Sequence, residues 1–367
     1  MRVVVAPDSF GGTLSAAEAA AAFAAGWRDV AAGDELVLLP VSDGGPGMVT
    51  ALAAAIPDSR LLAVEVPGPT GEVRPRELLV TGETAYVESA LGCGLEELRA
   101  LGGDVRTAST YGVGELIAAA AAVEGVRAVV VGLGGSGTND GGAGVWAALG
   151  AEPADVLRGG GMALRELAAV SAPPVPGVGL VAATDVDNPL LGLYGASAVY
   201  GPQKGADQAA IMALDTALER WADLVEAAVG APDLRNRPGT GAAGGLGFGL
   251  MALGAERQSG ADVVMTAVGL AAAIEGADLV VTGEGRFDAT SLRGKVVSGV
   301  AQRAQAAGVP CVVAAGQARI GSRDAAAHGI DEVWAVAAEL GSAEAALSAG
   351  AAGVRRLAAA VARSWSR

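Results

Sequence analysis

Short, continuous apolar runs recur along this chain, and most lead into a glycine-containing or polar loop, several with an alanine-rich stretch of helical length beyond it. Runs of four or five apolar residues suit strands that are buried on both faces, as in a parallel sheet. The repetition of strand, loop and helix predicts an α/β fold with mainly parallel sheets, in which ligands gather at the carboxyl ends of the strands. The predicted strands are Val3–Ala6, Leu36–Pro40, Ala128–Val131, Leu180–Ala183, Leu279–Thr282, Cys311–Ala315 and Glu332–Ala335, and the predicted helices include Ala16–Val30, Gly114–Val123, Gln208–Val229 and Val296–Ala307.

Two segments depart from this pattern. Arg60–Glu88 contains alternating β-prone residues around the turn signal PGPTGE, which predicts antiparallel strands and a crossing into a second domain. Ser342–Arg363 is rich in alanine and is expected to form a closing amphipathic helix.

Composition excludes several classes of function. The net charge of −15 argues against binding to nucleic acid or to an anionic membrane, so a polyanionic ligand would need local cations and backbone N–H groups. Two cysteines and one histidine are too few for a disulfide framework, a histidine metal site or a Ser-His-Asp triad. We find no signal peptide and expect no transmembrane helix, so a cytoplasmic protein is predicted. The sequence is compatible with a homodimer.

The first two apolar runs lead into polar segments that could hold a ligand. Asp8 follows the first predicted strand, where a carboxylate can hold Mg²⁺ or accept a proton from a hydroxyl, and we favour this over a structural role. Ser15 is expected to cap the next helix, with Glu18 as its capping-box partner. Asp43, in the segment SDGGPG, could bind a metal or close an Asx turn.

The segment GLGGSGTNDGGAG, from Gly132 to Gly144, is the most informative loop, because its seven glycines let the backbone offer N–H groups to phosphate oxygens. It is not a P-loop, since no Lys-Ser/Thr pair follows, and its Asn-Asp pair argues against a dinucleotide fingerprint. An ordinary glycine-rich loop is the alternative. A later segment, Gly239–Gly245, could be a second backbone cradle or a place of close helix packing. The residues expected to bind a cofactor are Gly134, Gly135, Ser136, Gly137, Thr138 and Asn139, and Asp140 is expected to meet a metal or a substrate hydroxyl.

Asp185 and Asp187 follow another apolar run and resemble a loop that binds a divalent metal or a hydroxyl. An Asn-Pro turn that caps a following helix is the competing interpretation. Lysine occurs only at Lys204 and Lys295, while every other basic residue is arginine. A lysine in a glycine-rich motif then suggests a site that needs a compact charge, as phosphate binding often does.

Taken in order, these segments resemble the motifs of the bacterial glycerate kinase family, whose members make 2-phosphoglycerate. The segments that carry the resemblance are APDSFGGTLSAAEAA, LPVSDGGPG, STYGVGELI, GLGGSGTNDGGAG, TDVDNPL, YGPQKGA, GTGAAGGLG and VTGEGRFDATSLRGK. They cover nearly the whole chain, and their ordered combination is far more specific than any one of them.

The resemblance implies two α/β domains, ATP and Mg²⁺ as cofactors, D-glycerate as substrate, and an active site in the cleft between the domains. Residues 1–60 and 280–367 are expected to form a discontinuous Rossmann-like domain. Residues 61–279 are expected to form an inserted α/β domain that carries the main glycine-rich loop.

Phosphoryl transfer needs alignment and charge neutralisation more than covalent chemistry. We expect the amides of Gly134–Gly137 to hold the phosphates of ATP or the carboxylate of the substrate. One or two of Asp43, Asp185 and Asp187 are expected to bind Mg²⁺, and Asp185 is also expected to take part in catalysis. Asp8 or Asp140 is expected to accept the proton of the hydroxyl, while Lys204 and Arg286 balance charge. Gly283 and Glu284 are expected to bind the cofactor.

This chain departs from the family motifs at several positions. Gly11 stands where the family has lysine, Pro46 where it has glutamate, Met48 where it has threonine, and residues 289–291 where a Gln-Thr pair is usual. Losing the lysine and the glutamate could remove a phosphate clamp and an acid, base or metal partner. Two alternatives therefore remain: a kinase of a different small hydroxy acid, and a kinase-derived ligand-binding or regulatory protein with weak or no catalysis. A nicotinamide-dependent oxidoreductase fits the α/β organisation but lacks the fingerprint.

Overall fold

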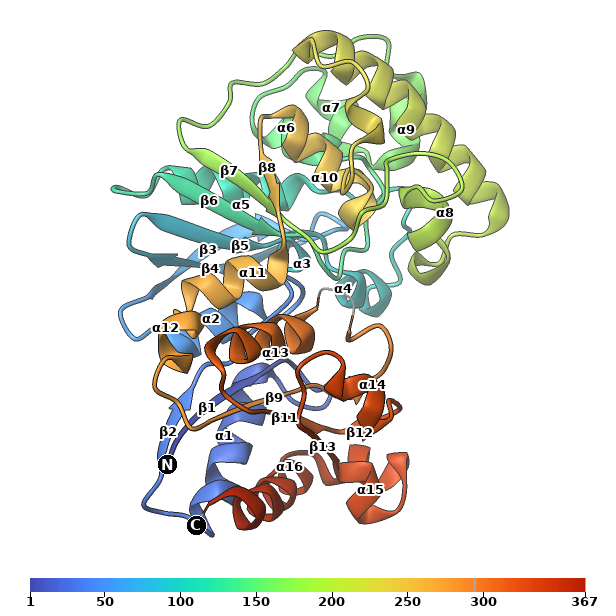
Figure 1. The fold of residues 1–367 in the computed structure, drawn as a ribbon. Helices are drawn as coiled ribbons and strands as arrows, with labels where there is room; N and C mark the ends of the chain where they lie inside the picture. The colour runs from blue at the N-terminus through green and yellow to red at the C-terminus, as the bar shows by residue number, and fades with distance from the viewer. Residues whose placement is uncertain (293–294, 367) are drawn as a thin grey trace. The chain divides into compact units, whose positions relative to one another are not determined.

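The computed structural model describes residues 1–292 and 295–366, and Figure 1 shows their ribbon. Arg293 and Gly294, which belong to the motif VTGEGRFDATSLRGK, lie outside the described residues. The chain divides into two compact α/β units. The terminal unit comprises Met1–Asp43, Thr50–Pro57 and Ala261–Arg367, and the middle unit comprises Gly44–Val49 and Asp58–Gly260. The predicted division put residues 44–49 and 58–60 in the terminal domain and residues 261–279 in the inserted domain. The structure places each of these segments in the other unit.

The terminal unit is built on a five-stranded sheet in which every neighbouring pair of strands is parallel. Its order is β13-β11-β9-β1-β2, so the predicted parallel sheet is confirmed. A separate pair of short parallel strands follows β9 and β11 in the chain. The strands are β1 (Arg2–Pro7), β2 (Glu35–Leu38), β9 (Leu279–Gly283), β11 (Cys311–Ala315) and β13 (Glu332–Ala335), with the short pair β10 (Arg286–Phe287) and β12 (Gln317–Ala318).

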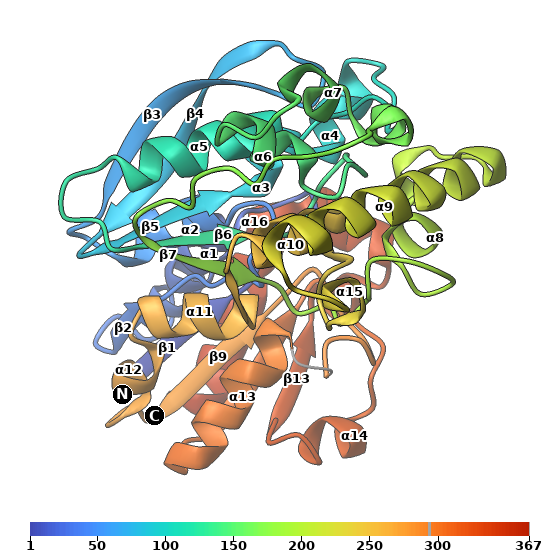
Figure 2. The same cartoon turned by 90° about the horizontal axis from the view of Figure 1, so that it is seen from above.

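Helices cover both faces of this sheet. Alternate strand residues such as Val3 and Val5 pack with α1 (Ala16–Arg28) and α16 (Ala343–Trp365), which also pack against each other. The residues between them, such as Val4, are buried as well and point to the opposite face, where α13 (Val296–Ala307) packs on β1, β9 and β11 (Figure 2). The other helices of the unit are α2 (Met48–Ala55) and α11 (Gly260–Ala267), each of which begins in the middle unit, together with α12 (Leu270–Ile274), α14 (Ser322–Ala326) and α15 (Val336–Leu340).

The predicted closing helix is α16, which is long and apolar and is kinked at Gly350. By length and composition alone it is long and apolar enough to cross a membrane, but Val354, Leu357 and Val361 pack into the core of the terminal unit. The helical conformation of α16 is interrupted at Gly350, which has φ 47° and ψ −128°.

The middle unit is built on a six-stranded mixed sheet of order β3-β4-β5-β6-β7-β8. The first two strand pairs are antiparallel, which confirms the antiparallel segment predicted at Arg60–Glu88, and the other three pairs are parallel. The strands are β3 (Arg60–Pro67), β4 (Val73–Thr81), β5 (Thr84–Glu88), β6 (Ala128–Gly132), β7 (Gly179–Ala183) and β8 (Glu256–Gln258).

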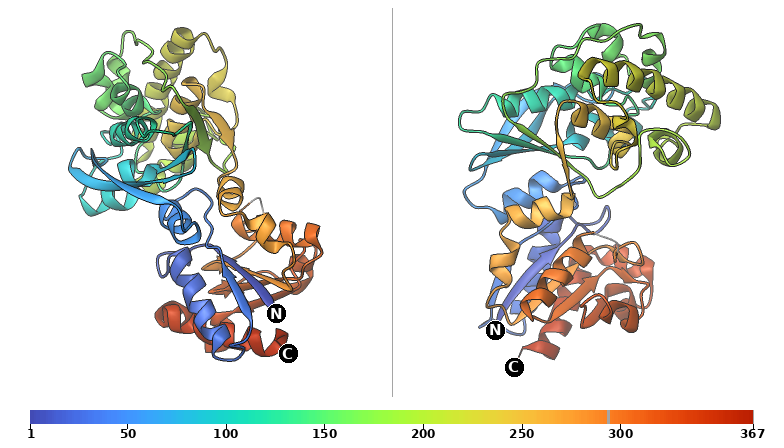
Figure 3. Two further views of the ribbon diagram at one scale, coloured as in Figure 1. Left: turned by 90° about the vertical axis from the view of Figure 1, so that its left-hand side faces the viewer. Right: turned by 45° about the horizontal axis from the view of Figure 1, so that its top comes forward.

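The core of the middle unit lies between this sheet and a layer of helices, shown in Figure 3. Trp146 and Trp221 meet edge to face in this layer, with ring centroids 5.2 Å apart. The glycines of Gly239–Gly245 are explained by packing, since a Cβ at Gly241 or Gly244 would overlap a backbone carbonyl. The helices are α3 (Ser89–Cys93), α4 (Leu95–Ala100), α5 (Tyr111–Ala121), α6 (Ala143–Ala148), α7 (Ala154–Arg158), α8 (Ala196–Tyr200), α9 (Gln208–Val229) and α10 (Ala242–Ala252), with 3₁₀ turns at Gly161–Glu166, Pro202–Lys204 and Leu234–Asn236.

Candidate functional site

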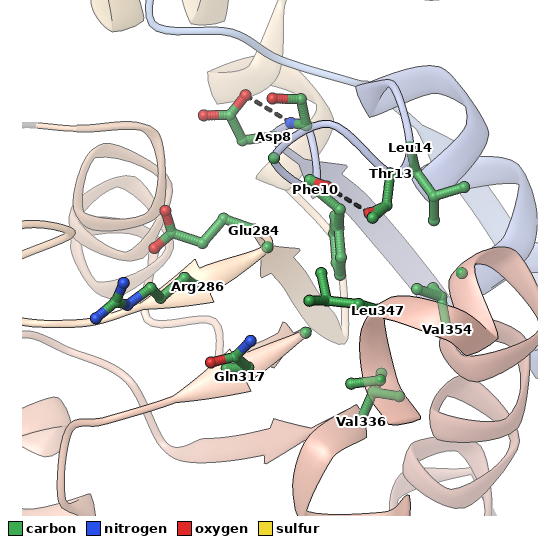
Figure 4. Close-up of a pocket in the computed structure, with 16 residues that line it drawn as sticks. Asp8, Phe10, Thr13, Leu14, Glu284, Arg286, Gln317, Val336, Leu347 and Val354 are labelled. Atoms are coloured by element: carbon green, nitrogen blue, oxygen red, sulfur yellow. Dashed lines mark hydrogen bonds between the residues drawn. The ribbon is translucent and has the colours of Figure 1, made fainter. Parts of the chain in front are cut away.

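In the terminal unit, the loops after β1, β9 and β11 border a pocket of about 400 Å³ (Figure 4). The amide of Asp8 donates to the carbonyl of Gly283 at 2.8 Å, which joins the first two loops. Glycine is needed at Gly283 and Gly316, because a Cβ at Gly283 would overlap the backbone of Ala314 in β11, and one at Gly316 would overlap the backbone of Gly285. The three strand ends can therefore approach each other closely, as sequence reasoning expects for a ligand site of a parallel sheet.

Asp8 lies at one end of this pocket and is partly buried. Its Oδ1 accepts a hydrogen bond from the amide of Ser9 at 2.6 Å. Burial first, and then the negative charges of Asp43 and Glu284, together raise the pKa of Asp8 to about 7, although the hydrogen bond from Ser9 opposes this rise. A carboxyl group with such a pKa is partly ionised near neutral pH and can accept a proton from a hydroxyl.

Glu284 and Arg286 extend the polar side of the pocket from the loop after β9 (Figure 4). Burial raises the pKa of Glu284. Its Oε1 is buried and has no hydrogen-bond partner among the described residues, so this oxygen can serve a ligand or a metal. Arg286 is half exposed, and its Nε lies 3.3 Å from Oδ2 of Asp288.

The opposite side of the pocket is apolar. Phe10 and Leu14 come from the loop after β1, and Val336, Leu347 and Val354 come from α15 and α16. Gly11 also borders the pocket and has φ +33°. A Cβ atom added to Gly11 would have no other atom within 4 Å, so the space beside it is open.

In the middle unit, strand register brings a second group of polar segments to one edge. Glu88 pairs with Gly132 across β5 and β6, and Gly132 pairs with Ala183 across β6 and β7. Glu88, the glycine-rich loop and Asp185 therefore lie together at the carboxyl end of the parallel part of the sheet.

Residues that are distant in sequence hold the glycine-rich loop in place through hydrogen bonds. The amide of Gly137 donates to the carbonyl of Cys93 at 2.7 Å. The ammonium group of Lys204 donates to Oγ of Ser136 at 3.0 Å and to the carbonyl of Thr138 at 2.6 Å. Lys204 is only 6% exposed, and burial lowers its pKa to about 8. Lys204 thus brings a cation to the loop, as its sequence context suggests, and its buried ammonium group is bound to Ser136 and Thr138 of that loop.

Asp140 also acts inside the loop. Its carboxylate is fully buried and accepts hydrogen bonds from the amide and hydroxyl of Thr110 and from the amides of Gly142 and Gly144, at 2.8 to 3.2 Å. Burial raises the pKa of Asp140 despite these donors. These four hydrogen bonds suit a residue that positions the loop, and the expected role of Asp140 in proton transfer stays a prediction.

The structure also narrows the part of the loop that can meet a cofactor. Thr138 and Asn139 are fully buried, and the side-chain amide of Asn139 donates to Oγ of Ser197 at 2.9 Å. Gly134 and Gly135 are the accessible positions, and no hydrogen bond recorded among the described residues uses the amide N–H of either. These two amides remain the candidates for binding an anionic group.

Sequence reasoning missed Glu88, which organises the segment beside these glycines. Glu88 is 5% exposed, and its carboxylate accepts a hydrogen bond from the amide of Val49 at 3.4 Å. Burial raises the pKa of Glu88, while the amides of Gly47, Val49 and Met48 oppose this rise. The only signal in the sequence is a lone glutamate after the apolar residues of β5.

The other predicted metal ligands lie in two places. Asp43 follows β2 in the terminal unit, whereas Asp185 and Asp187 follow β7 in the middle unit. Asp187 is largely exposed and forms an ion pair with Arg257 at 2.5 Å. Among residues 1–292 and 295–366, no three His, Cys, Asp or Glu side chains are close enough to hold a metal ion by themselves. A metal bound by these residues would need oxygens from a ligand as well.

A model of the glycerate kinase family matches residues 3–366. This chain belongs to the glycerate kinase family. It is 40% identical over 353 residues to the glycerate 2-kinase of Escherichia coli (strain K12), covering 93% of this chain and 92% of that protein. It is 40% identical over 347 residues to the glycerate kinase of Bacillus subtilis (strain 168), with coverage of 92% and 90%. A crystal structure assigned provisionally as glycerate kinase 2 of Salmonella typhimurium LT2 superposes with a TM-score of 0.83 at 39% identity, covering 99% of this chain and 98% of that one.

Within the glycerate kinase fold, the departures from the family motifs can now be placed. Gly11 leaves open space beside the terminal unit's pocket. Pro46 is exposed and lies against the accessible glycines, since a Cβ at Gly135 would overlap its ring. Met48 is fully buried and packs on Gly132. Of these three departures, those at Gly11 and Pro46 therefore change surfaces that a ligand can reach.

Proposed function

We propose that this protein transfers the γ-phosphoryl group of ATP to a hydroxyl of D-glycerate and so makes 2-phosphoglycerate. The names of its relatives support glycerate as the acceptor. The observation that carries the proposal is Asp8, a carboxyl group with a pKa of about 7 in a pocket at the ends of parallel strands. The expected active site in the cleft between the domains stays a prediction.

In the proposed reaction, the attacking hydroxyl oxygen forms a bond to the γ-phosphorus as the bond from that phosphorus to the β,γ-bridging oxygen breaks. ADP leaves with the electron pair of the broken bond, and Asp8 accepts the proton of the hydroxyl. Arg286 supplies charge near the pocket. The amides of Gly134 and Gly135 bind an anionic group, and Lys204 holds their loop in place.

The residues present fit Mg²⁺, a hard cation that prefers carboxylate oxygens and usually takes one or two of them together with phosphate oxygens and water. The orphaned Oε1 of Glu284 and the carboxylate of Asp43 would hold it beside Asp8. Bound Mg²⁺ would neutralise charge on the phosphates. Roles for Asp185 and Asp187 as metal ligands, and for Asp185 in catalysis, remain proposals.

We further propose that the enzyme acts in the cytoplasm on a small hydroxy acid, without a nucleic-acid or membrane partner, alone or as a homodimer.

A kinase-derived binding protein is the second candidate, and Gly11 and Pro46 favour it because each replaces a charged residue of the family motif. A coupled ADP-release assay with ATP, Mg²⁺ and D-glycerate, run beside other small hydroxy acids, separates the two. Turnover on glycerate is the expected result. Turnover only on another acid would show that this acid, and not glycerate, is the substrate. ATP binding without turnover on any acid would favour the binding protein.

A further inference from the structure

The pocket of the terminal unit has two chemically different halves, and Figure 4 shows them side by side. Asp8, Glu284 and Arg286 lie on one side. Phe10, Leu14, Val336, Leu347 and Val354 form the other side, with Gln317 near the boundary. A ligand that fills a pocket of about 400 Å³ with such walls must have a polar end and an apolar end.

The apolar half of the pocket contains a leucine side chain that is exposed to solvent. Leu347 is 54% exposed, although it lies at the pocket beside residues such as Val336 and Val354 that are 3% exposed. An apolar ring placed against Leu347 would remove this surface from water, which is favourable in proportion to the buried area.

The helix that carries Leu347 is broken at the pocket wall. Gly350 lines the pocket and is non-helical, in the middle of α16. Because glycine carries no side chain, a ligand can approach the main chain of the wall closely at this kink. Gln317 adds a side-chain amide with both donor and acceptor capacity. Polar groups at the edges of an apolar slot suit a flat heterocycle with hydrogen-bonding edges.

We propose that the apolar half of this pocket binds the nucleobase of the nucleoside triphosphate, between Phe10 and the broken helix α16. The polar half then receives the phosphates. The inference rests on the proposed function and deepens it, because it assigns one of the two substrates to this pocket. Glycerate has a hydroxyl or a carboxylate on every carbon and no apolar surface to set against Val336, Leu347 and Val354.

Steady-state kinetics of Leu347→Trp test the proposal, because an indole at this position fills the apolar half. Loss of the base contacts is expected to raise KM for ATP by about ten-fold or more, with KM for glycerate changed less than about two-fold. Ser348→Trp is the matched control, since Ser348 is exposed on the same helix and does not line the pocket. It is expected to keep both constants.

A second measurement needs no variant. Adenosine has the base and no phosphate. It is expected to inhibit the wild-type enzyme in competition with ATP, and its inhibition is expected not to be relieved by an excess of glycerate. A rise in KM for glycerate alone in Leu347→Trp, or wild-type KM values for both substrates, would overturn the proposal, and so would adenosine that competes with glycerate.

The two proposals can fail separately. If the protein turns over no hydroxy acid, calorimetric titration with adenosine still tests the pocket. Binding to wild type and Ser348→Trp but not to Leu347→Trp would support the nucleobase site in a protein without kinase activity. Equal binding to all three proteins, or to none, would contradict it.

Discussion

At the scale of single residues, Asp8 links the pocket to chemistry through its protonation. Its pKa of about 7 is raised by burial and by the charges of Asp43 and Glu284. The ionised form is the base, so kcat/KM is expected to fall as the pH drops through this pKa. Asp8→Asn removes the base and is expected to lower kcat by about 10²-fold to 10⁴-fold at pH above the pKa.

The pH profile at constant excess Mg²⁺ checks this assignment. Wild type should show an acid limb in kcat/KM, and the residual activity of Asp8→Asn should lack that limb. A variant with wild-type turnover, or one that keeps the same limb, would remove Asp8 from the mechanism.

Lys204 gives a pH dependence of stability rather than of activity. Burial lowers its pKa from 10.5 to about 8 in the folded protein. Between these values the unfolded chain binds more protons than the folded chain, so this residue makes the free energy of unfolding rise with pH. Lys204→Met abolishes the titration, and its urea-unfolding free energy should rise less than that of wild type between about pH 7.5 and about pH 10. An identical rise in both proteins would contradict the buried position of this amine.

At the scale of elements, Glu88 tests how the segment beside the glycine-rich loop is held. Its buried carboxylate faces the amides that begin α2, and a glutamine can present only one acceptor oxygen to them. Glu88→Gln is expected to speed hydrogen exchange at the amides of Gly47–Val49 by about ten-fold, equivalent to about 1.4 kcal/mol. Glu83→Gln is the control, because the side chain of Glu83 is 68% exposed and forms an ion pair with the surface residue Arg127. Unchanged exchange in Glu88→Gln would mean that the carboxylate does not hold this segment.

Elements with local signals were predictable from the sequence. The helix predicted at Gln208–Val229 has those bounds, with Asp207 capping its start and Gly230 ending it in a left-handed conformation. The capping box of Ser15 and Glu18 is confirmed. The predicted strand Leu36–Pro40 extended too far, since β2 ends at Leu38.

The burial of the glycine-rich loop was not predictable, because it depends on partners that are distant in sequence. Lys204 and Ser136 are 68 residues apart, and Asp140 and Thr110 are 30 residues apart. The break in α16 was hidden as well. Gly350 is non-helical whereas Gly353 lies inside the same helix, and nothing in the local sequence separates the two.

At the scale of the whole molecule, the net charge of −15 acts against the encounter with two anionic substrates. Salt screens this long-range repulsion over a Debye length of about 10 Å at 0.1 M. The hydrogen bonds and cations of the site itself act at shorter range and are screened less. We therefore expect kcat/KM for glycerate to rise about two-fold to three-fold as KCl increases from about 10 mM to about 150 mM, with kcat nearly constant. The measurement needs Mg²⁺ and ATP held at saturation, so that kcat/KM reports the steps that begin with free glycerate. A steep fall in kcat/KM over the same range would mean that local cations, with Arg286 first among them, outweigh the charge of the molecule.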